Sequence, residues 1–234
     1  MAKRESFNWD MDWKQVIPKF ELDLAMGGAF EFEMRSAYHT QEEWDLLSTC
    51  EIQEDQSSKL LRFFLDPAAA HRSSLFLSEF LKIISKDVGG NINPAKVMVT
   101  LEPPLEGRDT KKYADIKIHD YKSKFNLLIE NKIHNTSIQN KQQVPEEFKR
   151  ARKMYGKNFL LVVLLPEESA SGKILTELNK IPKWEQFVAF LSWNPDITDL
   201  IDNLLNNLSD DYTFQALKHF RHFCLEVGGR EDEK

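Results

Sequence analysis

The sequence has few cysteines and no long hydrophobic run. Only Cys50 and Cys224 occur among its 234 residues, and they do not form a Cys-x-x-Cys pair. This excludes a disulfide framework and a cysteine-based zinc site. No apolar stretch approaches the roughly 18 residues that a membrane-spanning helix needs, and the charged N-terminus has no signal-peptide core. We therefore expect a cytoplasmic protein.

A glycine-rich phosphate loop is also absent. The pair Gly27-Gly28 stands outside any GxGxxG or Walker pattern and predicts a turn. The string SASGK at residues 169–173 lacks the first glycine of a P-loop and the Ser or Thr after its lysine. A nucleotide-binding loop of either kind is thus excluded.

An overall excess of basic residues is lacking as well, since the net charge is −6. The charges are distributed unevenly, however. Residues 108–157 contain 13 Lys or Arg and 6 Asp or Glu, so the rest of the chain carries a net charge of −13. A chain polarised in this way can present a basic face to phosphates. A solvated helix face around residues 149–153 explains part of the surplus equally well.

The length suits one main domain with a sizeable core. We divide the chain into an N-terminal arm or lid at residues 1–50, a core at 51–210, and a C-terminal helix with a charged tail at 211–234. The arm could be a lid, a dimerisation arm or a specificity element, so a homodimer is one option. Predicted helices cover residues 10–20, 41–47, 75–84, 145–155, 196–208 and 212–227, with another ending at 65, and predicted strands cover 96–101, 114–119, 125–131, 159–165 and 187–191.

The most informative stretch is YADIKIHDYKSKFNLLIENK at residues 113–132. Two runs rich in β-branched and aromatic residues flank a polar turn at residues 120–124, which is typical of a hairpin. Folding the two strands about this turn brings Asp115 opposite Glu130. Because side chains alternate between the faces of a strand, Glu130 and Lys132 share one face.

These residues predict a carboxylate cluster with a lysine beside it, which suits a divalent cation. An ordinary cross-strand ion pair between Asp115 and Lys132 is the alternative. The apolar run at residues 126–129 leads straight into Glu130. Buried carboxylates are rarely left without a partner or a metal.

Asp115, fourteen intervening residues and then Glu130-Asn131-Lys132 resemble the D…E-x-K signature of the PD-(D/E)XK nuclease superfamily. Ala114 stands where the proline of that name would be. Residues 54–84 resemble the opening of one branch, E…S-x-L-L-x-x-L-L-D-P…H-G…F-L…F-L, and Ser192-Trp193 resembles its closing segment. The matching residues are Glu54, Ser58, Leu60, Leu61, Leu65, Asp66, Pro67, His71, Phe76, Leu77, Phe80 and Leu81, with Arg72 in place of the expected glycine.

This resemblance implies an α/β fold of the restriction-endonuclease-like type, an αβββαβ core with a mixed central sheet flanked by helices, plus extra N- and C-terminal helices. It also implies a Mg²⁺ or Mn²⁺ site. Asp115, Glu130 and the Asn131 backbone carbonyl would be ligands, and Glu54 would complete the metal shell from a helix. Lys132 would position the attacking water, acting as a base only if its pKa is depressed.

Further residues are expected around this site. By the resemblance, a glutamine after the E-x-K lysine, Gln143 or alternatively Gln139, supports the site, and His71 orients substrate or hydrogen-bonds a backbone group. Arg108, Lys111 and Lys112 lie just upstream of Asp115, where phosphates of the substrate would pass.

The expected function is metal-dependent hydrolysis of phosphodiester bonds in DNA, as in restriction, phage defence, repair or mobile-element biology. A catalytically inactive nuclease fold that binds nucleic acid or protein is the alternative. Another is an interaction protein in which the cluster of Asp115, Glu130 and Lys132 is only an ion-pair network.

Overall fold

The computed structural model describes residues 19–22, 30–33, 54–84, 92–101, 114–134, 142–167, 171–206 and 211–229. The chain divides into two compact units, Met1–Trp44 and Asp45–Lys234. In the first unit, β1 (Lys19–Leu22) and β2 (Phe30–Glu33) form an antiparallel pair. The register places Phe20 opposite Phe32.

The helix predicted at residues 10–20 is wrong where it can be compared, because Lys19 and Phe20 belong to β1. Apolar residues alternate with charged ones in KFEL and FEFE, which is the period of a strand rather than of a helix. The remainder of that predicted helix, and the one at 41–47, lie outside the described residues.

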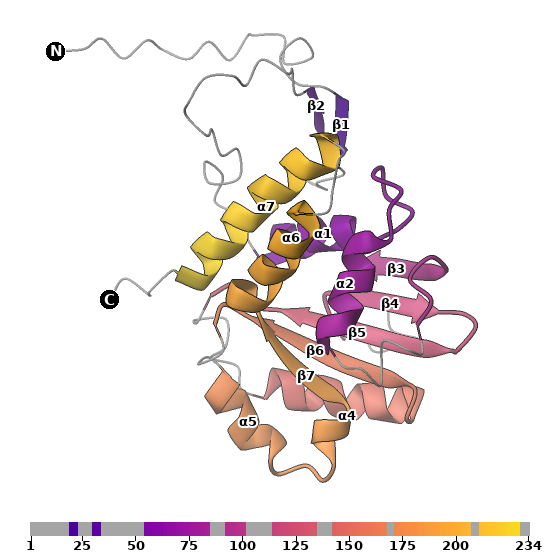
Figure 1. Ribbon diagram of the computed structural model, residues 1–234. Helices are drawn as coiled ribbons and strands as arrows, with labels where there is room; N and C mark the ends of the chain where they lie inside the picture. The colour runs from indigo at the N-terminus through magenta and orange to yellow at the C-terminus, as the bar shows by residue number, and fades with distance from the viewer. Residues whose placement is uncertain are drawn as a thin grey trace, which may run out of the picture. The chain divides into compact units, whose positions relative to one another are not determined.

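The second unit is built on a five-stranded sheet (Figure 1). Neighbouring strands lie in the order β3-β4-β5-β6-β7, antiparallel from β3 to β5 and parallel from β5 to β7. Helix α4 (Gln143–Tyr155) makes the crossover from β5 to β6, as a parallel pair requires. The strands are β3 (Val97–Leu101), β4 (Ile116–Asp120), β5 (Phe125–Asn131), β6 (Phe159–Leu165) and β7 (Val188–Ser192).

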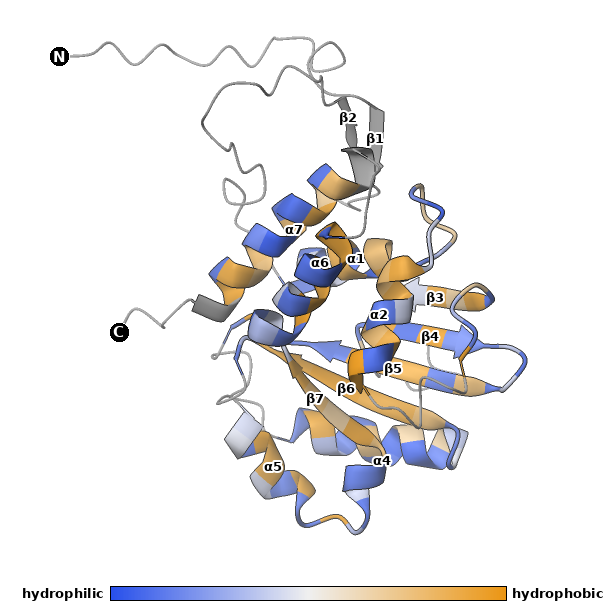
Figure 2. Cartoon of the chain, in the orientation of Figure 1, coloured by the Kyte–Doolittle hydropathy of each residue, from blue (hydrophilic) through white to orange (hydrophobic). Residues whose placement is uncertain are grey.

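Helices cover both faces of this sheet (Figure 1). On one face lie α1 (Glu54–Leu65), α2 (Leu75–Ile84), α6 (Thr198–Leu205) and α7 (Asp211–Gly229). On the other lie α4 and α5 (Gly172–Leu178). Every residue of β6 is therefore buried, and Figure 2 shows β6 and β7 as the most continuously hydrophobic strands.

This arrangement confirms the predicted mixed-sheet α/β fold and its αβββαβ order. The C-terminal helix α7 packs against α6 and belongs to the same unit as the sheet. The helix predicted at 196–208 is present as α6, Thr198–Leu205, and a wider turn at Trp193–Ile197 leads into it. None of the described helices combines the length and apolar character needed to cross a membrane.

Candidate active site

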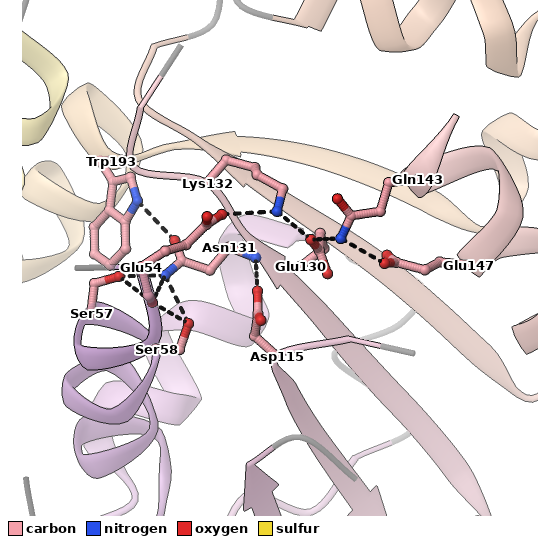
Figure 3. Close-up of polar contacts among 10 residues, drawn as sticks. All are labelled: Glu54, Ser57, Ser58, Asp115, Glu130, Asn131, Lys132, Gln143, Glu147 and Trp193. Carbon is pink, nitrogen blue, oxygen red and sulfur yellow. Dashed lines mark hydrogen bonds and ion pairs between the residues drawn. The ribbon is translucent and has the colours of Figure 1, made fainter. Parts of the chain in front are cut away.

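The site forms where β4 begins and β5 ends (Figure 3). Ile116 pairs with Ile129, so Asp115 lies across from Glu130 as predicted. The Asp115 N–H donates to the Ile129 carbonyl at 3.0 Å and extends the ladder by one residue. The Asp115 Oδ2 atom accepts a hydrogen bond from the Asn131 N–H at 2.7 Å. The backbone thus fixes Asp115 at the edge of the cluster.

Lys132 joins two carboxylates that come from different elements. Its Nζ atom lies 2.6 Å from Glu130 Oε1 and 2.8 Å from Oε1 of Glu54, the first residue of α1. On its other side, Glu130 Oε1 accepts from Gln143 Nε2 at 2.6 Å. Gln143 is the first residue of α4, which begins two residues before the predicted start. Four sequence-predicted residues, Glu54, Glu130, Lys132 and Gln143, therefore form one chain of contacts.

The Asn131 side chain lies on the opposite face of β5 and is completely buried. Its Nδ2 atom donates to the hydroxyls of Ser57 at 2.6 Å and Ser58 at 2.9 Å, and its Oδ1 accepts from Trp193 Nε1 at 3.1 Å. Both serine hydroxyls in turn donate to the Glu54 carbonyl. This network anchors the first turn of α1, and with it Glu54, to the end of β5.

Burial and mutual repulsion shift the protonation of the two strand carboxyls. Burial, followed by the charge of Glu130, raises the pKa of Asp115 to about 8. Burial also raises the pKa of Glu130, although Lys132 opposes this. Burial alone would lower the pKa of Lys132, but the carboxylates of Glu130 and Glu54 raise it above its usual value. Lys132 is therefore held as an ammonium between its two partners.

A fourth carboxyl belongs to this cluster and was not predicted from the sequence. Glu147 lies one helical turn after Gln143, is 5% exposed, and accepts from Gln143 Nε2 at 3.0 Å through Oε1. Burial and the charge of Glu130 raise the pKa of Glu147 well above its ordinary value. Its signal in the sequence was a charged residue on the inward stripe of α4, beside the buried Phe148.

The donors present suit a hard divalent cation. Four carboxyl groups, those of Glu54, Asp115, Glu130 and Glu147, lie along this network of contacts, and two of them, Glu54 and Glu130, pair with the ammonium of Lys132 (Figure 3). Such an oxygen-rich, negatively charged set is the kind that Mg²⁺ or Mn²⁺ prefers. In the structure, these carboxyl groups accept hydrogen bonds from Lys132, Gln143 and the Asn131 N–H. Within the described part of the chain, no three His, Cys, Asp or Glu side chains already converge on one ion position.

Of the remaining predicted residues, His71 makes its contacts away from this cluster. His71 Nε2 donates to the Phe63 carbonyl at 2.7 Å, and Nδ1 accepts from the Ser73 N–H at 3.0 Å. Of the two roles predicted for His71, these contacts fit hydrogen bonding to the backbone and leave neither ring nitrogen directed at a substrate. Four further candidates, Arg108, Lys111, Lys112 and Gln139, fall outside the described residues.

One of three comparisons with known proteins agrees with this geometry. No curated protein and no solved structure matches the sequence significantly. A family model described as the PD-(D/E)XK nuclease superfamily matches residues 43–225, which include the whole sheet and the carboxylate cluster. With this match across most of its length and a mixed sheet of the expected order, the chain belongs to the PD-(D/E)XK nuclease superfamily.

Proposed function

We propose that this protein is a metal-dependent nuclease that hydrolyses phosphodiester bonds in DNA. The observation that carries the proposal is the contact chain from Glu54 through Lys132 and Glu130 to Gln143, beside Asp115. It joins two helices to the end of β5. An isolated surface ion pair would not need Glu130 and Lys132 to be buried, as they are here.

The carboxylates of Asp115 and Glu130 would hold a Mg²⁺ or Mn²⁺ ion, with the Asn131 carbonyl as a further ligand and Glu54 completing the shell. When bound, such a cation neutralises charge that builds on the phosphoryl oxygens and on the leaving oxygen. The raised pKa values of Asp115 and Glu130 support this role, because a cation would replace the protons that relieve their repulsion.

Lys132 would act as a cation rather than as a general base. A base must be neutral at the working pH, whereas two carboxylates keep the pKa of Lys132 raised. Its ammonium would oppose negative charge on the scissile phosphate and hold the attacking water by a hydrogen bond. Glu54 and Glu130 keep the ammonium at this position through contacts of 2.8 and 2.6 Å.

The basic middle of the chain supports a nucleic-acid substrate. Residues 108–157 carry 13 Lys or Arg against 6 Asp or Glu. Arg108, Lys111 and Lys112 would add salt-sensitive contacts to phosphates next to the cluster. We propose DNA rather than RNA as the nucleic acid that this segment binds, and both are tested below.

The test is incubation of the purified protein with supercoiled, linear and single-stranded DNA and with RNA, with and without Mn²⁺. We expect Mn²⁺-dependent nicking of DNA that D115A, E130A and K132A abolish while circular dichroism shows a retained fold. K82A, which removes a surface lysine paired with Glu79, is the control and keeps activity. Unchanged nicking by K132A would refute the assignment. No cleavage, together with no Mn²⁺ binding by calorimetry, would favour the inactive scaffold.

A further inference from the structure

Glu147 is a buried carboxylate in a helix face that is otherwise apolar. The same face of α4 buries Val144, Phe148 and Ala151. Among the described residues, the Oε2 atom of Glu147 is buried without a hydrogen-bond partner. A buried carboxylate oxygen without a hydrogen-bond partner lowers the stability of the folded protein, which indicates that Glu147 has a functional role. By contrast, its neighbour Glu146 is exposed and pairs with Arg150, as is usual for a glutamate on a surface helix.

The contacts of Gln143 indicate what this role of Glu147 is. Its Nε2 atom donates to Glu130 Oε1 at 2.6 Å and to Glu147 Oε1 at 3.0 Å. A glutamine side chain can turn either its NH₂ or its carbonyl toward a neighbour, and the hydrogen-bond partners decide which. With an acceptor for each N–H, only the NH₂ orientation satisfies both carboxylates. Without Glu147, the second N–H would have no acceptor among these contacts.

We propose that Glu147 is a positioning residue that acts through Gln143: it fixes the Gln143 amide as a donor to Glu130 and so sets the orientation of the Glu130 carboxylate toward the cation. This inference rests on the proposed nuclease function. Groups behind a metal ligand orient it and tune its affinity.

A double-mutant cycle tests this route. The variants are E147L, Q143L and E147L/Q143L, with E147Q as the conservative replacement and E146L as the matched control on the same helix turn. Calorimetry measures the Kd for Mn²⁺, nicking of supercoiled DNA measures kcat and KM, and urea unfolding without metal measures stability. E147L is expected to weaken Mn²⁺ binding and to lower kcat by about tenfold with KM for DNA unchanged.

The proposal requires E147L/Q143L to be no worse than Q143L alone, because Glu147 has no effect once its mediator is removed. E147Q should keep most Mn²⁺ affinity, since its side-chain carbonyl can still accept from Gln143, and E146L should match the wild type. Independent losses that multiply in the double variant would overturn the proposal. So would an E147L protein with wild-type Kd and kcat.

Failure of the nuclease function is separately visible. If the wild type neither binds Mn²⁺ nor cleaves DNA, the proposed function fails. The unfolding free energies from urea then test the contact by themselves. A loss in E147L/Q143L that is smaller than the sum of the losses in E147L and Q143L supports the Glu147–Gln143 coupling. Additive losses overturn it.

Discussion

Trp193 and Asn131 meet by a hydrogen bond of 3.1 Å between the indole Nε1 and the amide Oδ1, both side chains being completely buried. Trp193 follows the last strand, and its ring also packs against Phe220 and Phe223 of α7. Asn131 is the middle residue of the E-x-K triplet. One contact therefore connects the C-terminal helices to the strand that bears the site.

Removing the Asn131 side chain should destabilise the protein strongly. N131A leaves the Trp193 N–H unpaired and removes the donor to Ser57 and Ser58, so we expect a loss of about 2–4 kcal/mol in unfolding free energy. W193F leaves Asn131 Oδ1 without its indole donor and opens a cavity where the larger ring was, so we expect a loss of similar size. Urea denaturation measures both. An N131A protein within about 0.5 kcal/mol of the wild type would contradict the importance of this network.

Neutralising Glu54 should weaken the site without abolishing it. E54Q can still accept a hydrogen bond from Lys132 but loses the charge that contributes to the raised Lys132 pKa. We expect Mn²⁺ affinity and DNA nicking to fall about tenfold, less than the complete loss in K132A. D55N is the matched control, because Asp55 is the next residue and forms an exposed pair with Lys59. Equal nicking by E54Q and D55N would exclude Glu54 from the site.

The sequence predicted the β4–β5 hairpin and its residue pairing because that information is local. A polar turn between two apolar runs fixes the register, and the register alone places Asp115 across from Glu130. The buried strand β6 was likewise predicted from its continuous apolar run. The β1–β2 pair was missed, since its strands are four residues each and its alternation is short.

The supporting contacts of the site could not be derived in the same way. Asn131 meets Ser57 and Ser58 across more than seventy residues, and Trp193 reaches it across 62. No local period encodes such pairs, because they depend on how helices dock on the sheet. Glu147 was missed for a different reason: charged residues usually mark the solvated face of a helix, and here one is buried beside Gln143.

Arg72 occupies a position where glycine should be more favourable. It adopts a φ of 45°, in the left-handed region that costs a residue with a Cβ roughly 1–2 kcal/mol. The Arg72 side chain is exposed, so few contacts are lost on replacement. R72G should therefore raise the unfolding free energy by up to about 1 kcal/mol, after allowing for the greater freedom of glycine in the unfolded chain. R72A keeps the unfavourable backbone and should give no gain, so a gain of the same size in R72A would point to the side chain instead.

The metal-free protein should lose stability as the pH rises from about 4 to about 8. Over this window the unfolded chain releases the Asp115 proton near the ordinary pKa of 3.8, whereas the folded protein keeps it up to a pKa of about 8. The folded state then holds more protons, so its stability falls with pH by up to about 1.4 kcal/mol per pH unit for one group. The raised pKa of Glu130 acts with the same sign.

Urea unfolding in EDTA at several pH values between 5 and 8 measures this slope. D115N removes one titrating group and should make the slope shallower, while Glu130 and Glu147, whose pKa values are also raised, still contribute to it. Lys132 contributes no slope here because its pKa is raised further above this window. Adding Mn²⁺ should reverse the trend, because the cation competes with the same protons and binds more tightly as the pH rises. A wild-type protein whose metal-free stability increases steadily from pH 5 to 8 would show that Asp115 is ionised in the folded state, and the electrostatic basis for the cation site would then be wrong.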